Sequence, residues 1–310
     1  MSKRVLLFPG QGIQFVGMAD TFAKFKWNSE ILNRVDESLG FPVISNQLTK
    51  LMREGPEEQL NLTEYAQPAI MTSSVLHWKY MSEMYGIMES SFSFALGHSL
   101  GEYTACVVGG AISIEDGVKL AYIRGKSMQE AVNGLAIRMT AVMASESIVR
   151  KALSEVSFEG TCEIAGINHD RQVVLSGTRD SVDLIADYIK KHYKAPVKHL
   201  NVSAPFHCKL MKPAADRIKE ELEKITVKSS KLPVISNATS LPVVHPEEIK
   251  KSLVDNIVNP AMFLRGMEYV LSHGCSLFTE YGSKKILSGL ATKIIQDRKL
   301  DGLAVDIHDK

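Results

Sequence analysis

Short apolar runs recur along the chain and alternate with longer segments of helical spacing. The runs VLLF (5–8), FSFAL (92–96), LPVIS (232–236) and CSLFTE (275–280) are typical of buried strands. Between them, apolar residues recur every three to four positions, which is the spacing of amphipathic helices. Strands that alternate with helices favour a parallel sheet covered by helices. The pattern therefore predicts an α/β core whose first strand begins near Val5.

Residues 135–203 have a different order of elements. Strands are predicted at 136–144, 162–168, 172–177 and 196–202, and helices from about Glu146 and over 179–193. The order β-α-β-β-α-β is that of a ferredoxin-like fold. The chain has no repeat and no Pro/Gly/Ser-rich linker, so we expect this unit to be inserted into the core. The predicted domains are 1–134 with 204–310 for the core, and 135–203 for the insertion.

The composition argues against several functional classes. The 310 residues are 45% hydrophobic and 23% charged, as in globular proteins, and the net charge of +1 gives no global field for nucleic acid or a membrane surface. The four cysteines are far apart, which fits neither a zinc site nor a disulfide framework and predicts a reducing, intracellular compartment. No apolar run reaches the roughly 18 residues of a membrane-spanning helix. No signal or transit segment is evident, so we expect a soluble protein.

The stretch GHSLG, residues 97–101, is the first candidate for chemistry. Ser99 follows a predicted strand and precedes a helical run from Leu100, which is the context of a nucleophile elbow. The flanking glycines permit the tight turn, and the Leu100 amide could donate to a developing oxyanion. The alternative is that Ser99 only caps the helix. The bare pattern arises by chance in about one chain in ten of this length.

A serine nucleophile needs a base, and nine histidines are available. His207 is the best candidate, because its loop follows the last strand of the insertion, where two lobes would meet. The alternative is a partly buried loop histidine without a catalytic role. His98 adjoins Ser99 and should point elsewhere, into a pocket wall, while His273 and His308 are weaker rivals.

Two further residues could bind a substrate. Gln11 lies in FPGQGIQ (8–14), a loop that either presents an amide donor to a reacting oxygen or is an ordinary strand-to-helix turn. The loop has neither of the glycine-rich nucleotide-binding patterns. Arg124, in a helical run, could bind a carboxylate in bidentate fashion or could simply lie on a solvated face.

Seven stretches occur in the order and at the approximate spacing of one enzyme family. They are FPGQG (8–12), QPAIM (67–71), GHSLGEY (97–103), IRGKSMQEA (123–131), VVLSG (173–177), APFHCKLMKPA (204–214) and NPAMF (259–263). Over nearly its whole length the chain thus resembles the malonyl-CoA:acyl-carrier-protein transacylases of the acyltransferase family. The resemblance implies that Ser99 is the nucleophile, His207 the base and Arg124 the ligand of the malonyl carboxylate. It also implies that Gln11 and the Leu100 amide line the oxyanion hole.

The same resemblance carries expectations about fold, partners and compartment. It implies an α/β-hydrolase-like core with a ferredoxin-like insertion, no metal and no cofactor beyond the substrate malonyl-CoA, and acyl carrier protein as partner. The oligomeric state is left open, with a monomer as the working expectation. NLTEYAQPAIM (61–71) and VISNATSLPV (234–243) are closer to mitochondrial members. The expected compartment is the mitochondrial matrix for a eukaryotic chain and the cytoplasm for a bacterial one.

The chain departs from the family pattern at two places. Bacterial members have a glutamine where this chain has Asn256, and the resemblance implies that this residue orients the histidine through its backbone carbonyl, so that asparagine can serve. The stretch YGSKKIL (281–287) replaces the usual GPGKVL, and we expect that loop to sit differently.

These features lead to a mechanism, two rivals and a docking hypothesis. The expected reaction is ping-pong transfer through a malonyl-serine ester, and Phe206 beside the histidine is expected to exclude branched acyl groups. The rivals are a thioesterase and a catalytically idle carrier-binding module.

Six lysines and no acidic residue lie between Ile189 and Lys212, forming either a carrier docking surface or a solvated helix face: Lys190, Lys191, Lys194, Lys198, Lys209 and Lys212.

Overall fold

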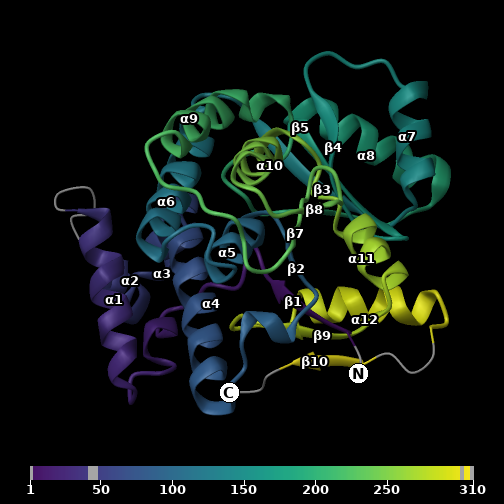
Figure 1. The fold of residues 1–310 in the computed structure, drawn as a ribbon. Coiled ribbons are helices and arrows are strands. Elements are labelled where there is room, and N and C mark those ends of the chain that lie inside the picture. The colour runs from purple at the N-terminus through teal and green to yellow at the C-terminus, as the bar shows by residue number, and fades with distance from the viewer. Residues whose placement is uncertain (1–2, 41–47, 301–303, 308–310) are drawn as a thin grey trace.

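A mostly parallel sheet of six strands forms the centre of the protein, whose computed structural model describes residues 3–40, 48–300 and 304–307 (Figure 1). The strand order is β10-β9-β1-β2-β7-β8. The parallel strands are β1 (Lys3–Phe8), β2 (Phe94–Gly97), β7 (Val234–Ile235), β9 (Cys275–Glu280) and β10 (Ala304–Ile307), and β8 (Pro242–Val243) runs antiparallel to β7. The α/β class predicted from the apolar runs is confirmed.

Helices cover both faces of this sheet, because successive strand residues point to opposite sides. In β1, Leu6 and Phe8 belong to one apolar core, and Val5 and Leu7 belong to the other. The first core is built with α1 (Lys26–Leu39), α2 (Leu48–Glu54), α3 (Glu57–Leu60), α4 (Thr63–Tyr85), α5 (Leu100–Val108), α6 (Ile114–Glu130), α9 (Lys212–Leu222) and α10 (Pro246–Val258). The second is built with α11 (Phe263–Ser272) and α12 (Leu287–Asp297). Buried strands of this kind need apolar residues on both faces, as their sequences have.

A smaller antiparallel sheet lies beside the large one. Its strands have the order β4-β5-β3-β6, with two helices in the connections. Along the chain the elements are β3 (Ile137–Val142), α7 (Glu146–Glu155), β4 (Cys162–His169), β5 (Gln172–Thr178), α8 (Arg179–Tyr193) and β6 (Val197–His199). One face packs on α7 and α8 through residues such as Val173 and Leu175. The other face carries Met139, Ala165 and Val174 and is turned toward the loop that contains Phe206.

Some predicted boundaries were wrong. The strand predicted over 196–202 ends at His199, because the chain then leaves the sheet edge to run past a pocket. The edge strands β8 and β10 were not predicted, since short edge strands carry little alternating pattern. The first strand begins at Lys3, two residues before the predicted start. Three short 3-10 helices, Met18–Asp20, Glu89–Ser91 and Lys209–Met211, complete the described elements.

Candidate active site

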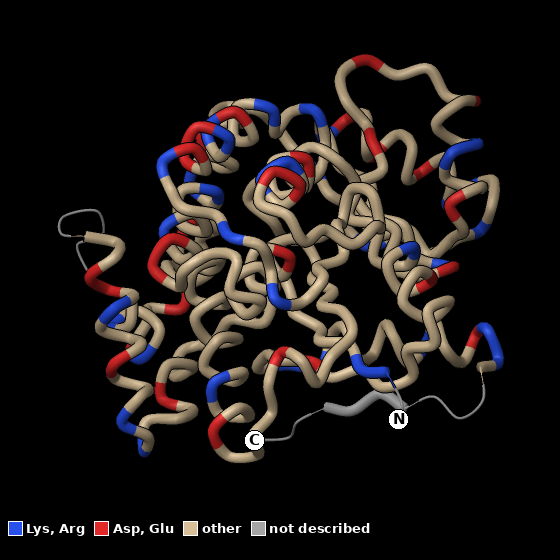
Figure 2. The backbone as a smooth tube through the Cα atoms, in the orientation of Figure 1, with Lys and Arg blue, Asp and Glu red and all other residues tan. Residues whose placement is uncertain are grey.

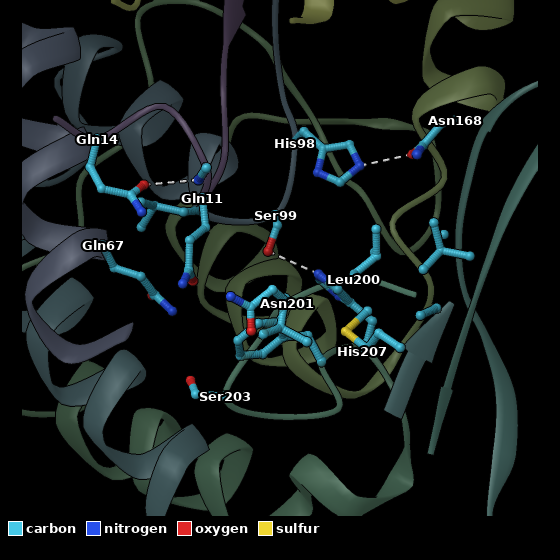
Figure 3. Close-up of a pocket in the computed structure, with 18 of the residues that line it drawn as sticks. Gln11, Gln14, Gln67, His98, Ser99, Asn168, Leu200, Asn201, Ser203 and His207 are labelled. Atoms are coloured by element: carbon cyan, nitrogen blue, oxygen red, sulfur yellow. Dashed lines mark hydrogen bonds between the residues drawn. The ribbon is translucent and has the colours of Figure 1, made fainter. Parts of the chain in front are cut away.

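A pocket of about 550 Å³ lies between the carboxyl end of the large sheet and the open face of the small one. Loops that follow β1 and β2 form one side, and the small sheet with residues 200–203 forms the other. Ligands of open α/β sheets bind at this edge, where the loops after parallel strands converge. Figure 3 shows Gln11, His98, Ser99 and His207 directed into this space.

Ser99 sits in a strained turn between β2 and α5. Its backbone angles, φ 53° and ψ −109°, lie outside the regions that residues with a side chain ordinarily adopt. The turn is possible because its two glycines permit close approach: a Cβ on Gly97 would lie 2.0 Å from the Gly101 carbonyl carbon, and one on Gly101 would lie 1.9 Å from the Phe8 oxygen. The Ser99 side chain makes no capping hydrogen bond to α5, so the capping alternative is wrong.

The Ser99 hydroxyl is hydrogen-bonded to His207. The Nε2–Oγ distance is 2.8 Å, although 108 residues separate the two in sequence (Figure 3). On the other side of the ring, Nδ1 lies 2.7 Å from the carbonyl oxygen of Asn256 and 3.1 Å from that of Asn259. Carbonyl oxygens only accept, so Nδ1 carries the proton and Nε2 is free to accept the serine proton. This is the arrangement of a nucleophile and its base.

Burial keeps this histidine neutral. Desolvation, followed by the positive charge of Arg124 and the proximity of His98, lowers the pKa of His207 to about 3. His98 lies in the pocket wall, where its Nε2 is 3.0 Å from Asn168 Oδ1. His273 is exposed at the end of α11 and lines no part of the pocket. His308 lies outside the described residues.

Arg124 is buried beside the nucleophile, so the alternative of a solvated arginine is wrong. It is 1% exposed, and its Nη2 donates to Ser99 Oγ (3.1 Å) and to Asn256 Oδ1 (2.9 Å). Its Nη1 donates to Gln67 Oε1 at 2.8 Å, and its guanidinium lies 5.1 Å from the Tyr103 ring centroid. The Nε atom is buried and has no hydrogen-bond partner among the described residues. The site thus presents a fixed cation to the pocket.

The two residues named from the sequence as oxyanion donors, Gln11 and Leu100, also line the pocket. Leu100 is the first residue of α5, and its N–H is hydrogen-bonded to no described residue. Gln11 lies in the loop after β1, and its Nε2 donates to Thr63 Oγ1 at 3.2 Å. Residues 281–287, where the sequence departs from the family pattern, contact the loop that follows β1, since Ser283 Oγ donates to the Ile13 carbonyl at 2.8 Å.

A set of polar side chains behind the elbow was not predicted from the sequence. Asn237 accepts the Ser99 N–H at Oδ1 (2.7 Å) and donates from Nδ2 to the Gly97 carbonyl (2.7 Å), so it clamps both sides of the turn. Glu102, in the first turn of α5, is fully buried and accepts from Asn237 N (3.0 Å) and Asn256 Nδ2 (2.7 Å). In the sequence, the indications of these roles were an acidic residue, Glu102, within the apolar run of α5 and an amide residue, Asn237, just after β7.

The carboxylate of Glu102 is poised between two protonation states. Burial raises its pKa to about 7, while hydrogen bonds from Ser252, Asn237 and Asn256 and the charge of Arg124 act in the opposite direction. A carboxylate kept inside the protein at this cost usually serves a site.

Charged residues of both signs are distributed over the described part of the fold. Figure 2 shows basic and acidic residues interspersed over the helices around both sheets. Within the described ranges, no group of three or more His, Cys, Asp or Glu side chains is placed to hold a metal ion. None of the helices described is long and apolar enough to cross a bilayer.

Known proteins resemble this chain over nearly its full length. The family model of the acyl transferase domain matches residues 5–281. The malonyl CoA-acyl carrier protein transacylase of Bacillus subtilis is 36% identical over 308 residues, covering 98% of this chain and 94% of the relative. In the solved structures, the malonyl CoA-acyl carrier protein transacylase of Coxiella burnetii is 31% identical and has a TM-score of 0.89, with 99% of this chain and 93% of that one covered.

A further solved structure shows a relative with its partner. It contains a type II PKS acyl-carrier protein in complex with its malonyl-transacylase. That relative is 31% identical to this chain and has a TM-score of 0.90, and the match covers 100% of this chain and 96% of that one. The extent of these matches means that the chain belongs to the acyl transferase family and is an acyltransferase.

Proposed function

We propose that this acyltransferase moves a malonyl group from malonyl-CoA to the phosphopantetheine thiol of an acyl carrier protein, and so supplies fatty acid biosynthesis. The observation that carries the proposal is the pair of contacts at one oxygen: Ser99 Oγ lies 2.8 Å from the His207 base and 3.1 Å from the Arg124 guanidinium. Relatives named as malonyl CoA-acyl carrier protein transacylases support the substrate and the carrier.

In the first half-reaction, the malonyl group moves onto the enzyme. His207 Nε2 takes the Ser99 proton as Oγ attacks the thioester carbonyl, and the oxyanion receives hydrogen bonds from the Leu100 and Gln11 amides. The carbon–sulfur bond then breaks, and the CoA sulfur leaves with the proton from His207. A malonyl-serine ester remains, with its carboxylate paired to Arg124.

The second half-reaction reverses these steps with another thiol. His207 takes the proton of the phosphopantetheine thiol, whose sulfur attacks the ester carbonyl. The carbon–oxygen bond to Ser99 breaks, and Oγ recovers the proton from His207. The chemistry needs no metal or cofactor, because nucleophile, base, oxyanion donors and carboxylate ligand all come from the chain.

We interpret the two sheets as an α/β-hydrolase-like core with a ferredoxin-like insertion over residues 135–203. The element order β-α-β-β-α-β and the strand order β4-β5-β3-β6 support this interpretation. In this arrangement the insertion supplies an apolar wall of the pocket, and Phe206, which follows the insertion and is half-buried between the two lobes, extends it. The wall would hold the acyl group against the core, which carries Ser99.

We also propose that basic residues near the pocket dock the carrier protein. All six lysines of the cluster are exposed. The fold brings acidic partners to two of them, since Lys209 pairs with Glu163 at 3.8 Å and Lys212 pairs with Asp216. The remaining four, which have no ion-pair partner in the described part of the chain, form what we call the docking cluster: Lys190, Lys191, Lys194 and Lys198.

Intact mass spectrometry tests the proposed transfer. The protein is mixed with malonyl-CoA, beside acetyl-CoA and a Ser99→Ala control, and holo acyl carrier protein is then added. We expect one malonyl adduct on the unmodified protein, absent from the control, stable in water and discharged by the carrier. Rapid release of malonate without an adduct would establish the thioesterase instead, and absence of both adduct and turnover would leave only a carrier-binding module.

A further inference from the structure

Glu102 is an interior carboxylate one helical turn after the nucleophile. It is fully buried and does not line the pocket. Its Oε2 accepts from the Asn237 backbone N–H and from Asn256 Nδ2, and its Oε1 accepts from the Ser252 hydroxyl. All three donors are neutral, so within the described residues its charge has no direct ion-pair partner. The nearby positive charge that acts on it is that of Arg124.

The Asn256 side chain connects this carboxylate to the guanidinium. Its Nδ2 donates to Glu102 at 2.7 Å and to the Ser99 carbonyl at 3.2 Å, while its Oδ1 accepts from Arg124 at 2.9 Å. An ionised carboxylate only accepts hydrogen bonds, and a guanidinium only donates them. Only one orientation of the amide satisfies both neighbours, because the flipped amide would place acceptor against acceptor and donor against donor. Arg124 and the ionised Glu102 therefore favour the same orientation of the Asn256 amide, and the charge of Glu102 strengthens the hydrogen bond that fixes this amide against Arg124.

We propose that Glu102 is a positioning residue for acyl selection: through Asn256 it keeps the Arg124 guanidinium beside Ser99 and so favours acyl groups that end in a carboxylate. This inference rests on the proposed malonyl transfer, in which Arg124 binds that carboxylate. Glu102 touches neither substrate nor the reacting atoms.

The carboxylate acts along two routes with different consequences. The first runs through the Asn237 backbone to the clamp on the Ser99 turn, and its loss affects every acyl donor equally. The second runs through Asn256 to Arg124, and its loss weakens malonyl transfer more than acetyl transfer, because only the malonyl group has a carboxylate for Arg124 to bind. The ratio of malonyl to acetyl transfer isolates the second route from a general weakening of the fold.

Glu102→Gln removes the charge with little change in volume. Its amide oxygen can accept from Asn237 and Asn256, and its NH₂ can donate to Ser252, whose hydroxyl then donates to Ser236 Oγ, 2.6 Å away. The charge-assisted bond to Asn256 becomes a weaker neutral one. We expect the rate of Ser99 acylation, followed by intact mass, to fall about thirtyfold with malonyl-CoA and about threefold with acetyl-CoA.

Glu280→Gln is the matched control. Glu280 is also a buried carboxylate, 2% exposed, but it accepts from the backbone N–H groups of Ile286, Leu287 and Ser288 at the start of α12 and lines no part of the pocket. The malonyl-to-acetyl ratio should stay within about twofold of the unmodified protein in this variant.

Asn256→Leu provides a second variant that leaves Glu102 in place. It removes the amide link but keeps the backbone carbonyl that faces His207. We expect the same fall in the ratio, and no further fall when both substitutions are combined, because they interrupt one route.

An unchanged ratio in either single variant, or additive effects in the double variant, would overturn the inference. An unmodified protein that prefers malonyl-CoA while Glu102→Gln leaves its ratio intact would refute only the role of Glu102. An unmodified protein that forms no malonyl adduct would refute the proposed function and this inference with it.

Discussion

Arg124 holds a positive charge inside the protein with three neutral side chains around its Nη atoms. Gln67, Asn256 and Ser99 accept its hydrogen bonds, and none of them neutralises the charge. A buried cation without a contacting anion is costly, and a substrate carboxylate would relieve that cost. The residue therefore suits recognition of a charged acyl group better than the stabilisation of the fold.

Removal of this guanidinium should change the acylation rates with malonyl-CoA and acetyl-CoA by different amounts. We expect Arg124→Ala to lower the acylation rate with malonyl-CoA by about 100-fold, because a hydrogen-bonded charge contributes up to about 3 kcal/mol, while acetyl transfer falls little or rises. Single-turnover intact mass measures both rates. Arg124→Met, which refills more of the volume, guards against a loss of folding, and equal losses for both donors would contradict the role.

His207 should act as a base in unusually acidic solution. Its pKa of about 3 means that the neutral ring, which accepts the serine proton, persists as the pH falls below the ordinary value of 6.5. Between pH 7.5 and 5.5, the neutral fraction of a histidine with the ordinary pKa would fall about tenfold, whereas the neutral fraction of His207 should hardly change.

Inactivation by a neutral serine-reactive phosphonate measures this base without involving the acyl carboxylate. We expect a rate that changes less than about twofold across this pH range, in the unmodified protein and in Glu102→Gln, whose residue 102 cannot titrate. A tenfold fall with a midpoint near pH 6.5 in both proteins would show that the histidine titrates normally.

At the scale of elements, α5 lies directly against the end of β1. Gly101 is the contact point, because a Cβ there would lie 1.9 Å from the Phe8 carbonyl oxygen and 3.1 Å from that of Pro9. Gly289, in α12, is the opposite case: it is exposed in a helix, and an added Cβ would meet no atom within 4 Å. The two glycines thus allow one substitution to be compared in two environments.

The same change should have opposite effects at these positions. Gly101→Ala should lower the free energy of unfolding by about 3 kcal/mol through overpacking and abolish acylation, because α5 must move away from the elbow. Gly289→Ala should raise it by about 0.5–1 kcal/mol, since alanine loses less backbone entropy on folding. Chemical denaturation checks both, and a stable, active Gly101→Ala protein would show that α5 can shift without cost.

At the scale of the whole molecule, the docking cluster lies on the small-sheet lobe, close in sequence to the pocket-lining residues 200–203. Reversal of two of its charges, Lys191→Glu with Lys198→Glu, should raise the apparent KM for carrier protein about tenfold at low salt and much less at 0.5 M salt. The malonylation half-reaction should be unaffected.

Lys26→Glu is the control for this prediction. Lys26 is 92% exposed and begins α1, which lies on the opposite side of the molecule from α7 and α8 (Figure 1). Steady-state kinetics with purified holo carrier gives the KM values. An increase in the KM for carrier protein that persists at high salt, or an increase of equal size in Lys26→Glu, would argue against a specific docking surface.

Local chemistry made part of the candidate site visible in the sequence. Ser99 could be recognised because strand, glycines and helix follow one another within a few residues. The roles of Asn237, Glu102 and Gln67 could not be assigned, even though Glu102 and Asn237 stand at unusual positions, because their partners lie 135, 154 or 57 positions away. His207 could be recognised only in part, since its position in a loop suggested a cleft but did not indicate which residues it would contact.

The sequence by itself determined the kinds of elements and the turn at Ser99, because hydrophobic period and glycine sterics act between near neighbours. It also indicated the family, through motifs spread over the whole chain. Only the tertiary structure decided which atoms meet at the serine: the carbonyl of Asn256 behind His207, the orientation of the Asn256 amide and the burial of Arg124 and Glu102. These depend on how separate strands and helices pack, and packing brings together residues whose separation in sequence carries no local signal.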